Sequence, residues 1–331
     1  MVKCVRVPKK DANSVRIRMK LDNILDPYYE IRAEQDNILI PLIGSYYENY
    51  DIVEADLKVL KREETDYKAL LPVDVRNLLP SSYDKIGDAA IIRLVDKLLP
   101  LKYEIGRALM ETSSNVRCVF LDSGIVGNFR VRNLEMIAGK GPSEIQYKEF
   151  GVIMNTDLTK VYCNPRLATE RRRVASLVKD DEVIIDMFAG IASFPLIICK
   201  HARPKTVYAI DLNHTAVEYA KKNVVANHFN NVVVLEGDAR VLVKNLPLAD
   251  RIIMNLPQIA HSFLPDALER TKSGGTIHMY KVMDRSRSEE FCSGIVSEMT
   301  KKGLHCELSE LRELKTYSSS ASIYVLDIVK C

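Results

Sequence analysis

Residues 183–200 read VIIDMFAGIASFPLIICK, and this stretch decides the fold of the chain. A short apolar run ends in an acid and a single glycine, and a second apolar run, long enough for a helix, follows at 193–202. The same alternation recurs downstream, with apolar strands expected at 206–210, 232–236, 251–255 and 276–280, and helices at 214–227, 239–246, 262–273 and 286–302. Apolar strands separated by helices are typical of a parallel sheet covered on both faces. Right-handed crossovers then predict a doubly wound α/β fold.

A length of 331 residues is too long for one ordinary core, so we expect additional domains before this sheet. The expected division is a small N-terminal α/β domain at 1–55, a charged linker at 56–69, a middle α+β domain at 70–149 and the doubly wound domain at 150–331. In the first we expect a strand at 3–7, a helix at 13–25 and a hairpin at 28–43 that turns at Gln35-Asp36-Asn37. Later we expect a strand at 89–95, a helix at 103–114, strands in VRCVFLD and NFRVRNLEMIAG, and a basic amphipathic helix at 166–179.

The composition excludes several classes of protein. Lys and Arg number 47 against 44 Asp and Glu, a formal charge of +3, so any nucleic-acid site must be a local patch. The seven cysteines are scattered without metal or redox spacing, as expected of reduced thiols in a cytoplasm. The longest run without charge, Met187–Cys199, has 13 residues, whereas a membrane helix needs about 20. We expect a cytoplasmic monomer with no secretory signal, no membrane partner and no metal.

Polar residues stand at the ends of four expected strands. The first strand is followed by Asp186, the second by Asp211, the third by Asp238 and the fourth by Asn255. Ligands bind beyond the carboxyl ends of such strands, and an acid closing the second strand can accept both hydrogen bonds of a ribose diol. The loop after the first strand has one glycine, not G-x-G-x-x-G, so it lacks the spacing that brings a pyrophosphate to a helix N-terminus. The pattern therefore favours an adenosine carrier without a diphosphate, namely S-adenosylmethionine.

Two of these positions also have purely structural interpretations. Asp238 is equally well placed to cap a helix, and Asn255-Leu256-Pro257-Gln258 could simply end a strand, because Pro cannot continue one. That turn is related to Asn-Pro-Pro-Tyr loops, which hold an exocyclic amine with Asn and stack an aromatic ring on the base. The second Pro and the aromatic residue are missing here. Amino-group methylation is therefore disfavoured, whereas Asn255 can still bind the edge of a heterocycle.

Taken in order, several motifs resemble one family. They are FRVRNLE (129–135), VYCNPRLATERRRV (161–174), DMFAG (186–190), AIDLN (209–213) and MNLPQIAHSFLPDAL (254–268). They are similar to the archaeal and eukaryotic Trm5 family, tRNA methyltransferases that act on N1 of guanine 37, and the resemblance covers most of the chain. It implies a class I, Rossmann-like methyltransferase domain, a middle domain that grips tRNA and an N-terminal domain that contacts the tRNA elbow. It also implies S-adenosylmethionine as methyl donor and tRNA as partner.

The resemblance further implies roles for individual residues. Glu170 matches the general base, Arg130 the arginine that contacts guanine O6, and Asn255 a further catalytic residue. Substrate or tRNA contacts are implied for Tyr162, Pro257, Arg166, Arg171 and Arg132. Cofactor contacts are implied for Asp186, Phe188, Ala189, Gly190, Asp211, Leu212, Asp238, Ala239 and Asn255. The chain departs from the family at Thr169, at Ala192-Ser193 and at Gln258, which replaces a frequent Lys.

The chemistry explains why such residues are needed. N1 of guanine carries a proton at neutral pH, so an enzyme must remove it while positioning the base. A carboxylate whose pKa is raised by a closed pocket suits this task, and the planar cation of Arg130 suits charge that spreads toward O6. From spacing alone, however, Glu170 is better explained as a surface ion-pair partner of Arg166 or Arg173. The run of cations at 171–173 fits either a solvated face or phosphate contacts.

Three functions compete at this point. The first is methylation of N1 of guanine 37. The second is a wyosine-pathway transferase that acts on the tricyclic imidazopurine at position 37, by methyl or aminocarboxypropyl transfer, or an enzyme bifunctional for both. The third is a non-catalytic RNA-binding protein on the same scaffold, which Asp211, Glu170 and Asn255 disfavour.

Overall fold

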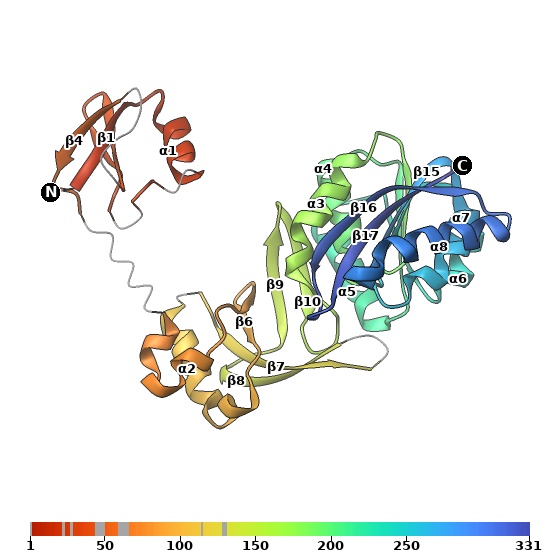
Figure 1. Ribbon diagram of the computed structural model, residues 1–331, viewed down its shortest axis with the longest axis horizontal. Helices are drawn as coiled ribbons and strands as arrows, with labels where there is room; N and C mark the ends of the chain where they lie inside the picture. The colour runs from red at the N-terminus through yellow and green to blue at the C-terminus, as the bar shows by residue number, and fades with distance from the viewer. Residues whose placement is uncertain are drawn as a thin grey trace. The chain divides into compact units, whose positions relative to one another are not determined.

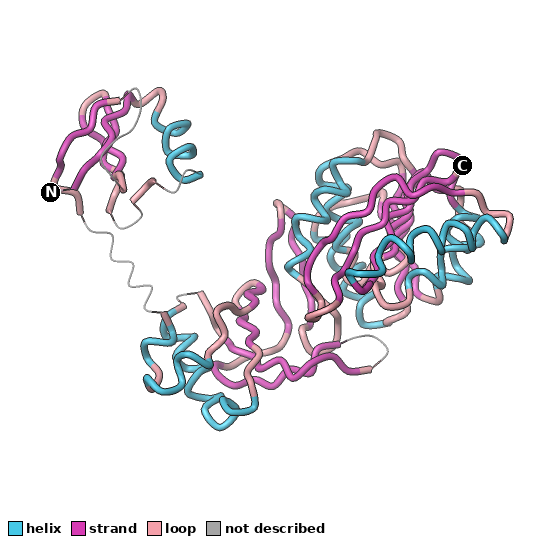
Figure 2. Tube along the Cα trace, viewed as in Figure 1, coloured by secondary structure: helices cyan, strands magenta, loops and turns pink. Residues whose placement is uncertain are grey.

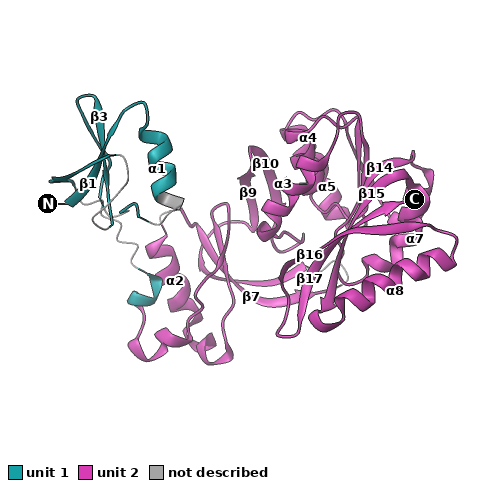
Figure 3. Cartoon of the chain, turned by 45° about the horizontal axis from the view of Figure 1, so that its top comes forward, with its two compact units in different colours: residues 1–70 teal, residues 71–331 magenta. Residues whose placement is uncertain are grey.

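The computed structural model describes residues 2–21, 24–26, 29–43, 50–58, 66–113, 115–127 and 131–331. The chain divides into two compact units, residues 1–70 and residues 71–331 (Figure 3). The expected linker at 56–69 lies partly outside the described residues, because these stop at Lys58 and resume at Asp66. The finer boundaries at 55, 69 and 149 stay predictions.

The N-terminal unit is a four-stranded antiparallel sheet with one helix. Its elements are β1 (Val2–Pro8), α1 (Ala12–Leu21), β2 (Arg32–Glu34), β3 (Asn37–Pro41), β4 (Asp51–Ala55) and the 3-10 helix η1 (Tyr67–Leu70), and the sheet order is β2-β3-β1-β4. Val5 and Val7 of β1 pack with Val15 and Met19 of α1, which forms a small apolar core. The hairpin turns at Gln35-Asp36, as expected, with Glu34 paired to Asn37. The helix ends earlier than expected, and Leu25 instead bridges to Leu42.

The second unit begins with a four-stranded sheet in the order β5-β6-β7-β8. Its elements are η2 (Val73–Leu78), β5 (Asp84–Ile86), β6 (Ala89–Ile92), η3 (Asp96–Leu101), α2 (Lys102–Thr112), β7 (Cys118–Val126) and β8 (Val131–Gly139). Helix α2 packs on this sheet through Gly106, where an added Cβ would lie 2.9 Å from that of Ala138. The expected strands and helix of the middle segment are therefore present, with β6 three residues shorter than expected.

A seven-stranded sheet with helices on both faces forms most of the remaining part of the second unit (Figures 1 and 2). Its order is β13-β12-β11-β14-β15-β17-β16. The strands are β11 (Val183–Asp186), β12 (Thr206–Asp211), β13 (Val232–Glu236), β14 (Ala249–Met254), β15 (Thr271–Asp284), β16 (Cys306–Thr316) and β17 (Ala321–Lys330). Helices α3 (Ala168–Leu177), α4 (Ser193–His201) and α5 (His214–Ala226) contribute to the core on one face. Helices α6 (Ala239–Leu242), α7 (Leu264–Arg270) and α8 (Ser288–Lys301) cover the other face. The domain also has four short 3-10 turns, η4 (Pro165–Leu167), η5 (Val243–Asn245), η6 (Ala260–Phe263) and η7 (Arg285–Arg287).

The five strands expected from the sequence form a parallel sheet, as predicted, and two strands that were not expected extend it. Strands β11 to β15 are parallel, but β17 pairs antiparallel with β15, and β16 pairs antiparallel with β17. A short turn, and no crossover helix, joins β16 to β17, which allows the antiparallel pairing. The strand order reverses between β11 and β14, the position at which doubly wound sheets bind ligands.

A hairpin that the sequence pattern does not predict precedes the seven-stranded sheet. Strands β9 (Glu144–Glu149) and β10 (Val152–Asp157) form it, and Ile145 contributes to the core of the middle segment. On β10, Val152 and Met154 pack instead in the core beneath α4 and α5. Asn223 of α5 accepts hydrogen bonds from the backbone and side chain of Asn155. The hairpin therefore ties the middle segment to the large sheet.

Several helices are shorter than their apolar periodicity predicts. The expected helix at 262–273 ends at Arg270, because Thr271 already begins β15, and the one at 239–246 divides into α6 and η5. In the part of the chain that the structure describes, no helix combines the length and the apolar character that a membrane span requires.

Candidate active site at the carboxyl edge of the sheet

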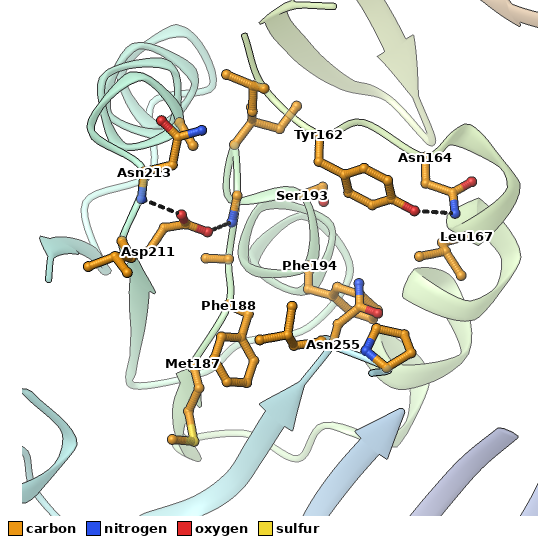
Figure 4. A pocket seen from close by; sticks show the side chains of 18 of the residues that line it. Tyr162, Asn164, Leu167, Met187, Phe188, Ser193, Phe194, Asp211, Asn213 and Asn255 are labelled. Carbon is orange, nitrogen blue, oxygen red and sulfur yellow. Dashed lines mark hydrogen bonds between the residues drawn. The ribbon is translucent and has the colours of Figure 1, made fainter. Parts of the chain in front are cut away.

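A cavity of about 330 Å³ opens at the carboxyl edge of the parallel strands, beside the switch between β11 and β14 (Figure 4). This volume falls at the lower end of the range typical of small-molecule sites. Figure 4 shows Asp211 and Asn213 on one side of the cavity and Tyr162, Asn164 and Leu167 on the other. Most site residues proposed from the sequence line it, namely Tyr162, Arg171, Phe188, Ala189, Gly190, Asp211, Leu212, Asp238, Ala239, Asn255 and Pro257. Glu170, Asp186, Arg132 and Arg166 are not among the lining residues.

Asp211 closes β12 and faces the loop after β11. Its Oδ2 accepts a hydrogen bond from Gly190 N at 2.7 Å, and its Oδ1 accepts one from Asn213 N at 2.9 Å. Burial raises the pKa of this carboxyl, and the backbone hydrogen bonds oppose that rise. A carboxylate has about four lone-pair sites, so two remain for a ligand. Asp211 can therefore hold a diol while it also fixes the Gly190 loop.

Gly190 leaves room where a side chain would intrude. Its φ is +55°, and an added Cβ would have only Tyr162 O within 4.0 Å, so it would project into open space at the cavity wall. An L-residue would be both strained and obstructive at this position. The cavity therefore accommodates a ligand against this backbone, as an adenosine carrier requires.

Apolar side chains and one acid line the cavity beyond Asp211. Leu212 is 60% exposed and Ile259 is 49% exposed, and the rings of Phe188 and Phe263 meet edge to face at 4.9 Å. Asp238 caps helix α6, because its Oδ1 accepts from Arg240 N at 2.8 Å. The capping interpretation of Asp238 is thus confirmed, and the residue lines the cavity as well. A flat apolar ring with polar edges fits these surroundings.

Asp186 lies behind the cavity wall. It is fully buried, and its Oδ1 accepts from Phe188 N at 3.2 Å. Its Oδ2 is buried and has no hydrogen-bond partner among the described residues. Burial, with a smaller contribution from the charge of nearby Asp211, raises the pKa of this carboxyl to about 8, against the opposing hydrogen bond from Phe188 N. An unpartnered buried acceptor carries a free-energy cost that a cationic or N–H donor would relieve.

The other end of the cavity is built on the turn after β14. Figure 4 shows Asn255 near Phe194 at the cavity wall. Val282 N donates to Pro257 O at 2.8 Å, and Lys281 Nζ donates to Gln258 O at 2.9 Å, so strand β15 fixes the Asn255–Gln258 turn. The turn therefore does more than end a strand, because it presents Asn255 to the cavity from a braced backbone.

Glu170 faces the sheet rather than the cavity. On the same helical segment Leu167 and Arg171, one turn apart, line the cavity, whereas Glu170 is only 2% exposed. Its carboxylate accepts from Tyr280 Oη at 2.8 Å and from Arg173 at 2.9 and 3.0 Å. The expected pairing with Arg173 is thus confirmed, although it is buried and not on the surface as the spacing suggested.

The charges around Glu170 decide its protonation. Burial raises the pKa of the Glu170 carboxyl, but the hydrogen bonds and charge of Arg173, with further hydrogen bonds from Tyr280 and Arg312, outweigh burial and lower it. Arg312 Nη2 lies 2.5 Å from Glu170 Oε2. The expectation of a raised pKa is therefore wrong, because the buried carboxylate is surrounded by cations. Glu170 is an ionised group held by three donors.

The same ionic cluster continues across the sheet. Arg173 also donates to Asp327 at 3.0 Å, and Asp327 Oδ1 lies 2.6 Å from His278 Nδ1. His278 Nε2 lies 2.7 Å from Arg251 Nη1, so Nδ1 carries the proton and donates to Asp327. Burial lowers the pKa of His278, which keeps the ring neutral near neutral pH. Helix α3 is thus fixed to strands β14, β15 and β17 through charges.

Arg171 is not available as a solvent-facing cation. It is 3% exposed and donates two hydrogen bonds to Glu149, at 2.5 and 2.6 Å, and two to Asn164 O at 3.3 Å. With Arg173 bound to Glu170 and Asp327, two of the three cations in the 171–173 run do not form a solvated face, and phosphate contacts by this run stay a prediction. Arg171 instead joins α3 to hairpin β9–β10 and to the segment that lines the cavity.

Arg132 and Arg166, which are also expected to contact tRNA, both form ion pairs with Asp84. Arg132 pairs with Asp84 at 3.2 Å, and Arg166 pairs with the same Asp84 at 2.6 Å. Arg132 Nη2 also reaches Cys163 O at 3.5 Å. The beginning of β8 therefore adjoins the segment at 161–164 that lines the cavity. Arg130 lies outside the described residues, immediately before β8.

Family models match almost the whole chain. The model of the TRM5/TYW2 methyltransferase domain matches residues 145–308, that of the TYW2 N-terminal domain matches 67–142, and that of the tRNA methyltransferase 5 N-terminal domain matches 4–51. The tRNA (guanine(37)-N(1))-methyltransferase Trm5b of Pyrococcus abyssi is 40% identical over 85% of this chain and 84% of its own length. The chain belongs to the Trm5 family.

Two further relatives of this Trm5-family chain bear on its ligands. The tRNA(Phe) (4-demethylwyosine(37)-C(7)) aminocarboxypropyltransferase of Methanocaldococcus jannaschii is 30% identical over 74% of this chain and 96% of its own length. The crystal structure of M. jannaschii Trm5 in complex with adenosine has a TM-score of 0.64 and 29% identity, and it covers 99% of each chain. The structural match extends over both units of this chain, whereas the aminocarboxypropyltransferase matches only three quarters of it.

Some lining residues of this Trm5-family site were not foreseen. They are Tyr147, Asn164, Ser193, Phe194, Asn213, Gly237, Ile259, Phe263 and Tyr317. Asn213 and Gly237 adjoin predicted strand ends, so neighbouring positions at those ends could have been included. Tyr317 follows a strand that was not assigned, and only the tertiary structure brings it to the cavity. Among the residues described, no cluster of three His, Cys, Asp or Glu side chains could hold a metal ion.

Proposed function

We propose that this protein transfers a methyl group from S-adenosylmethionine to N1 of guanine 37 in tRNA. The observation that carries the proposal is the single cavity in which an adenosine-type site at Gly190 and Asp211 continues into a second site at Asn255 and Pro257. The relative that is 40% identical bears the name of this activity. A donor and an acceptor bound in one cavity can react without leaving it.

The cofactor would occupy the end of the cavity over β11, β12 and β13. Asp211 would accept the ribose hydroxyls, and Leu212 with Ile259 would cover the adenine. Asp186 would receive a donor that its buried Oδ2 lacks, and the positive charge of a methionyl ammonium would lower the raised pKa of this carboxyl. S-adenosylmethionine supplies a methyl group already activated by a sulfonium, so the protein need only orient the donor and prepare the acceptor.

The target guanine would occupy the end of the cavity beside Asn255 and Pro257. An Asn side chain offers both a donor and an acceptor, and the Watson–Crick edge of guanine presents both kinds of group. Tyr162 lines the same cavity, and its hydroxyl accepts from Asn164 Nδ2 at 3.1 Å. Extruding a base from a tRNA loop costs less than extruding one from a duplex.

Glu170 is our proposed base for the N1 proton. Its carboxylate is ionised, and Tyr280, which donates to it, packs its ring against Phe194 of the cavity wall at 5.8 Å. Tyr280 and Phe194 therefore connect Glu170 to the cavity wall, and the carboxylate must exchange a bound donor for the guanine N1–H. Arg312, whose side chain is 34% exposed, is the partner with most freedom to leave.

Arg130 would balance the negative charge that develops on guanine O6. Strand β8, which begins at the next residue in the sequence, is anchored beside the cavity by the contact between Arg132 and Cys163 O. Arg166 is half exposed, with a side-chain exposure of 59%, and can contact a phosphate of the anticodon loop by exchanging Asp84.

Replacing Glu170 by Gln tests the base assignment. The substitution keeps the shape and the hydrogen bond from Tyr280 but removes the basic oxygen, so the single-turnover rate should fall by about 100- to 10,000-fold. Affinities for S-adenosylmethionine and tRNA should change little. Asp211→Ala serves as the control, because it should weaken the binding of S-adenosylmethionine, which Glu170→Gln should leave unchanged. An E170Q rate equal to that of the unaltered chain excludes Glu170 as the base.

A second candidate function is action on the tricyclic wyosine intermediate at position 37. It is favoured by the TYW2 N-terminal model that matches residues 67–142 and by the aminocarboxypropyltransferase relative. Parallel incubations with guanine-37 tRNA and with tRNA carrying the tricyclic intermediate, followed by nucleoside mass spectrometry, distinguish the two. Product on the tricyclic substrate alone would replace the first proposal.

A further inference from the structure

Tyr317 brings an exposed aromatic ring to the cavity from the edge of the sheet. It follows β16, the outermost strand, and lines the cavity with Val282 of β15 and Ile323 of β17. The residue is 48% exposed, whereas the other aromatic residues of the described cavity wall are buried or half-buried. Asp211 and Asp238 stand at the opposite end of the sheet order, so Tyr317 belongs to the end of the cavity left for the acceptor. An exposed ring in such a position is the surface that a flat ligand covers.

The turn that carries Tyr317 is held by hydrogen bonds, although its other three residues are serines. Tyr317 N and Ser318 N both donate to Ala321 O at 2.9 Å. Arg285 fixes the remaining residues of the turn. Its Nη1 donates to Ser319 O at 2.8 Å, its backbone N to Ser320 O at 3.0 Å and its Nε to Ser322 Oγ at 2.9 Å. A ring on a fixed turn loses little conformational freedom when a ligand binds. These hydrogen bonds therefore hold the ring of Tyr317 in place for a ligand, which an exposed turn without a binding role would not need.

Tyr317 is also tied to the turn that carries Asn255. Its hydroxyl lies 3.4 Å from Gln258 Nε2, and the Asn255–Gln258 turn is itself fixed by Val282 and Lys281. The aromatic ring and the Asn amide are thus held on connected backbones at one end of the cavity. Gln258, which departs from the frequent Lys of the family, provides this connection in the present chain.

We propose that Tyr317 is a stacking platform for the target purine, with Asn255 at the edge of the same base. In Asn-Pro-Pro-Tyr loops one turn supplies both the amide and the aromatic ring; here the amide comes from the turn after β14 and the ring from the β16–β17 turn. This inference rests on the proposed function, because it assumes a flipped base at this end of the cavity. Stacking on an aromatic residue contributes an affinity of about 5- to 150-fold per base.

The test compares two tRNA transcripts, one with guanine at position 37 and one with an abasic residue there. Y317A should weaken binding of the guanine-37 transcript by about 5- to 150-fold, and it should leave binding of the abasic transcript unchanged. Y317F keeps the ring and should bind the guanine-37 transcript almost as the unaltered chain does. Affinity for S-adenosylmethionine, measured by calorimetry on each variant, reports whether the cavity is still folded.

Two results overturn the inference. If Y317A loses the same affinity for both transcripts, Tyr317 contacts another part of the RNA. If Y317A loses no affinity for the guanine-37 transcript, Tyr317 does not contact the RNA. A failure of the proposed function is distinguishable, since the unaltered chain would then form no 1-methylguanosine on the guanine-37 transcript, whatever Y317A does to binding.

Discussion

At the scale of single residues, the charge state of Glu170 depends more on its neighbours than on its burial. Desolvation alone would favour the neutral acid, but Arg173 and Arg312 supply two cations to the same carboxylate. The carboxylate is therefore ionised and can accept a proton, but its lowered pKa makes it a weak base. Loosening one cation is therefore a way to make it a stronger base without moving the backbone.

Arg312→Gln tests this directly. Removing the cation raises the pKa of Glu170 toward the ordinary range of a glutamate, so the group becomes protonated at a higher pH. The acidic limb of the single-turnover rate, plotted against pH, should move to higher pH. Arg312→Lys keeps a positive charge and should shift the limb less. A limb in the same place for both variants and the unaltered chain would show that Arg312 does not set the proton affinity of the base.

At the scale of elements, strands β15 and β17 bring distant residues into one cluster. His278 and Asp327 are direct cross-strand partners, and Arg173 of α3 binds the same aspartate. These two partners outweigh burial and lower the pKa of Asp327 to about 2. Ionised Asp327 therefore contributes stability above the unfolded-state pKa of about 4, and this contribution is lost as pH falls toward 2.

Asp327→Asn should lower the free energy of unfolding by about 2–3 kcal/mol at neutral pH. The difference from the unaltered chain should shrink as pH falls from about 4 toward 2, because wild-type Asp327 then becomes protonated. Urea unfolding of both proteins at neutral and at acidic pH measures this difference in the free energy of unfolding. A difference that stays constant over that range would contradict the assigned ion pair.

The same elements explain what could be predicted from the sequence. The runs VIID and TVYAID end in Asp186 and Asp211, so they identified both the parallel strands and Asp211 as a site residue. The side chain of Glu170 turns toward Tyr280 and Arg312, which lie 110 and 142 residues away, and no local pattern contains that information. Tyr317 was missed for the same reason, since β16 and β17 had not been assigned. Local periodicity gives elements, whereas side-chain partners depend on how the elements pair.

At the scale of the whole molecule, the chain consists of two units with separate cores. Residues 1–70 match the tRNA methyltransferase 5 N-terminal domain over 4–51, and the cavity lies entirely in residues 71–331. We propose that the first unit contacts the tRNA elbow, so that it contributes to RNA binding without taking part in the chemistry.

Deletion of residues 1–70 should therefore leave the affinity for S-adenosylmethionine unchanged and raise the KM for full-length tRNA by about tenfold or more. An isolated anticodon stem–loop has no elbow, and the truncated and full-length chains should methylate it equally well. Steady-state kinetics on the two RNAs makes the comparison. An equal loss on the stem–loop would mean that the first unit acts elsewhere than at the elbow.

One measurement tests the central claim most directly. The full chain is incubated with a guanine-37 tRNA transcript and S-adenosylmethionine that carries an isotopically labelled methyl group, and the digested nucleosides are separated and weighed by mass spectrometry. The account predicts that the label appears in 1-methylguanosine, and that a transcript with adenosine at position 37 remains unlabelled. Label in any other nucleoside, or none in guanine-37 tRNA, would contradict it.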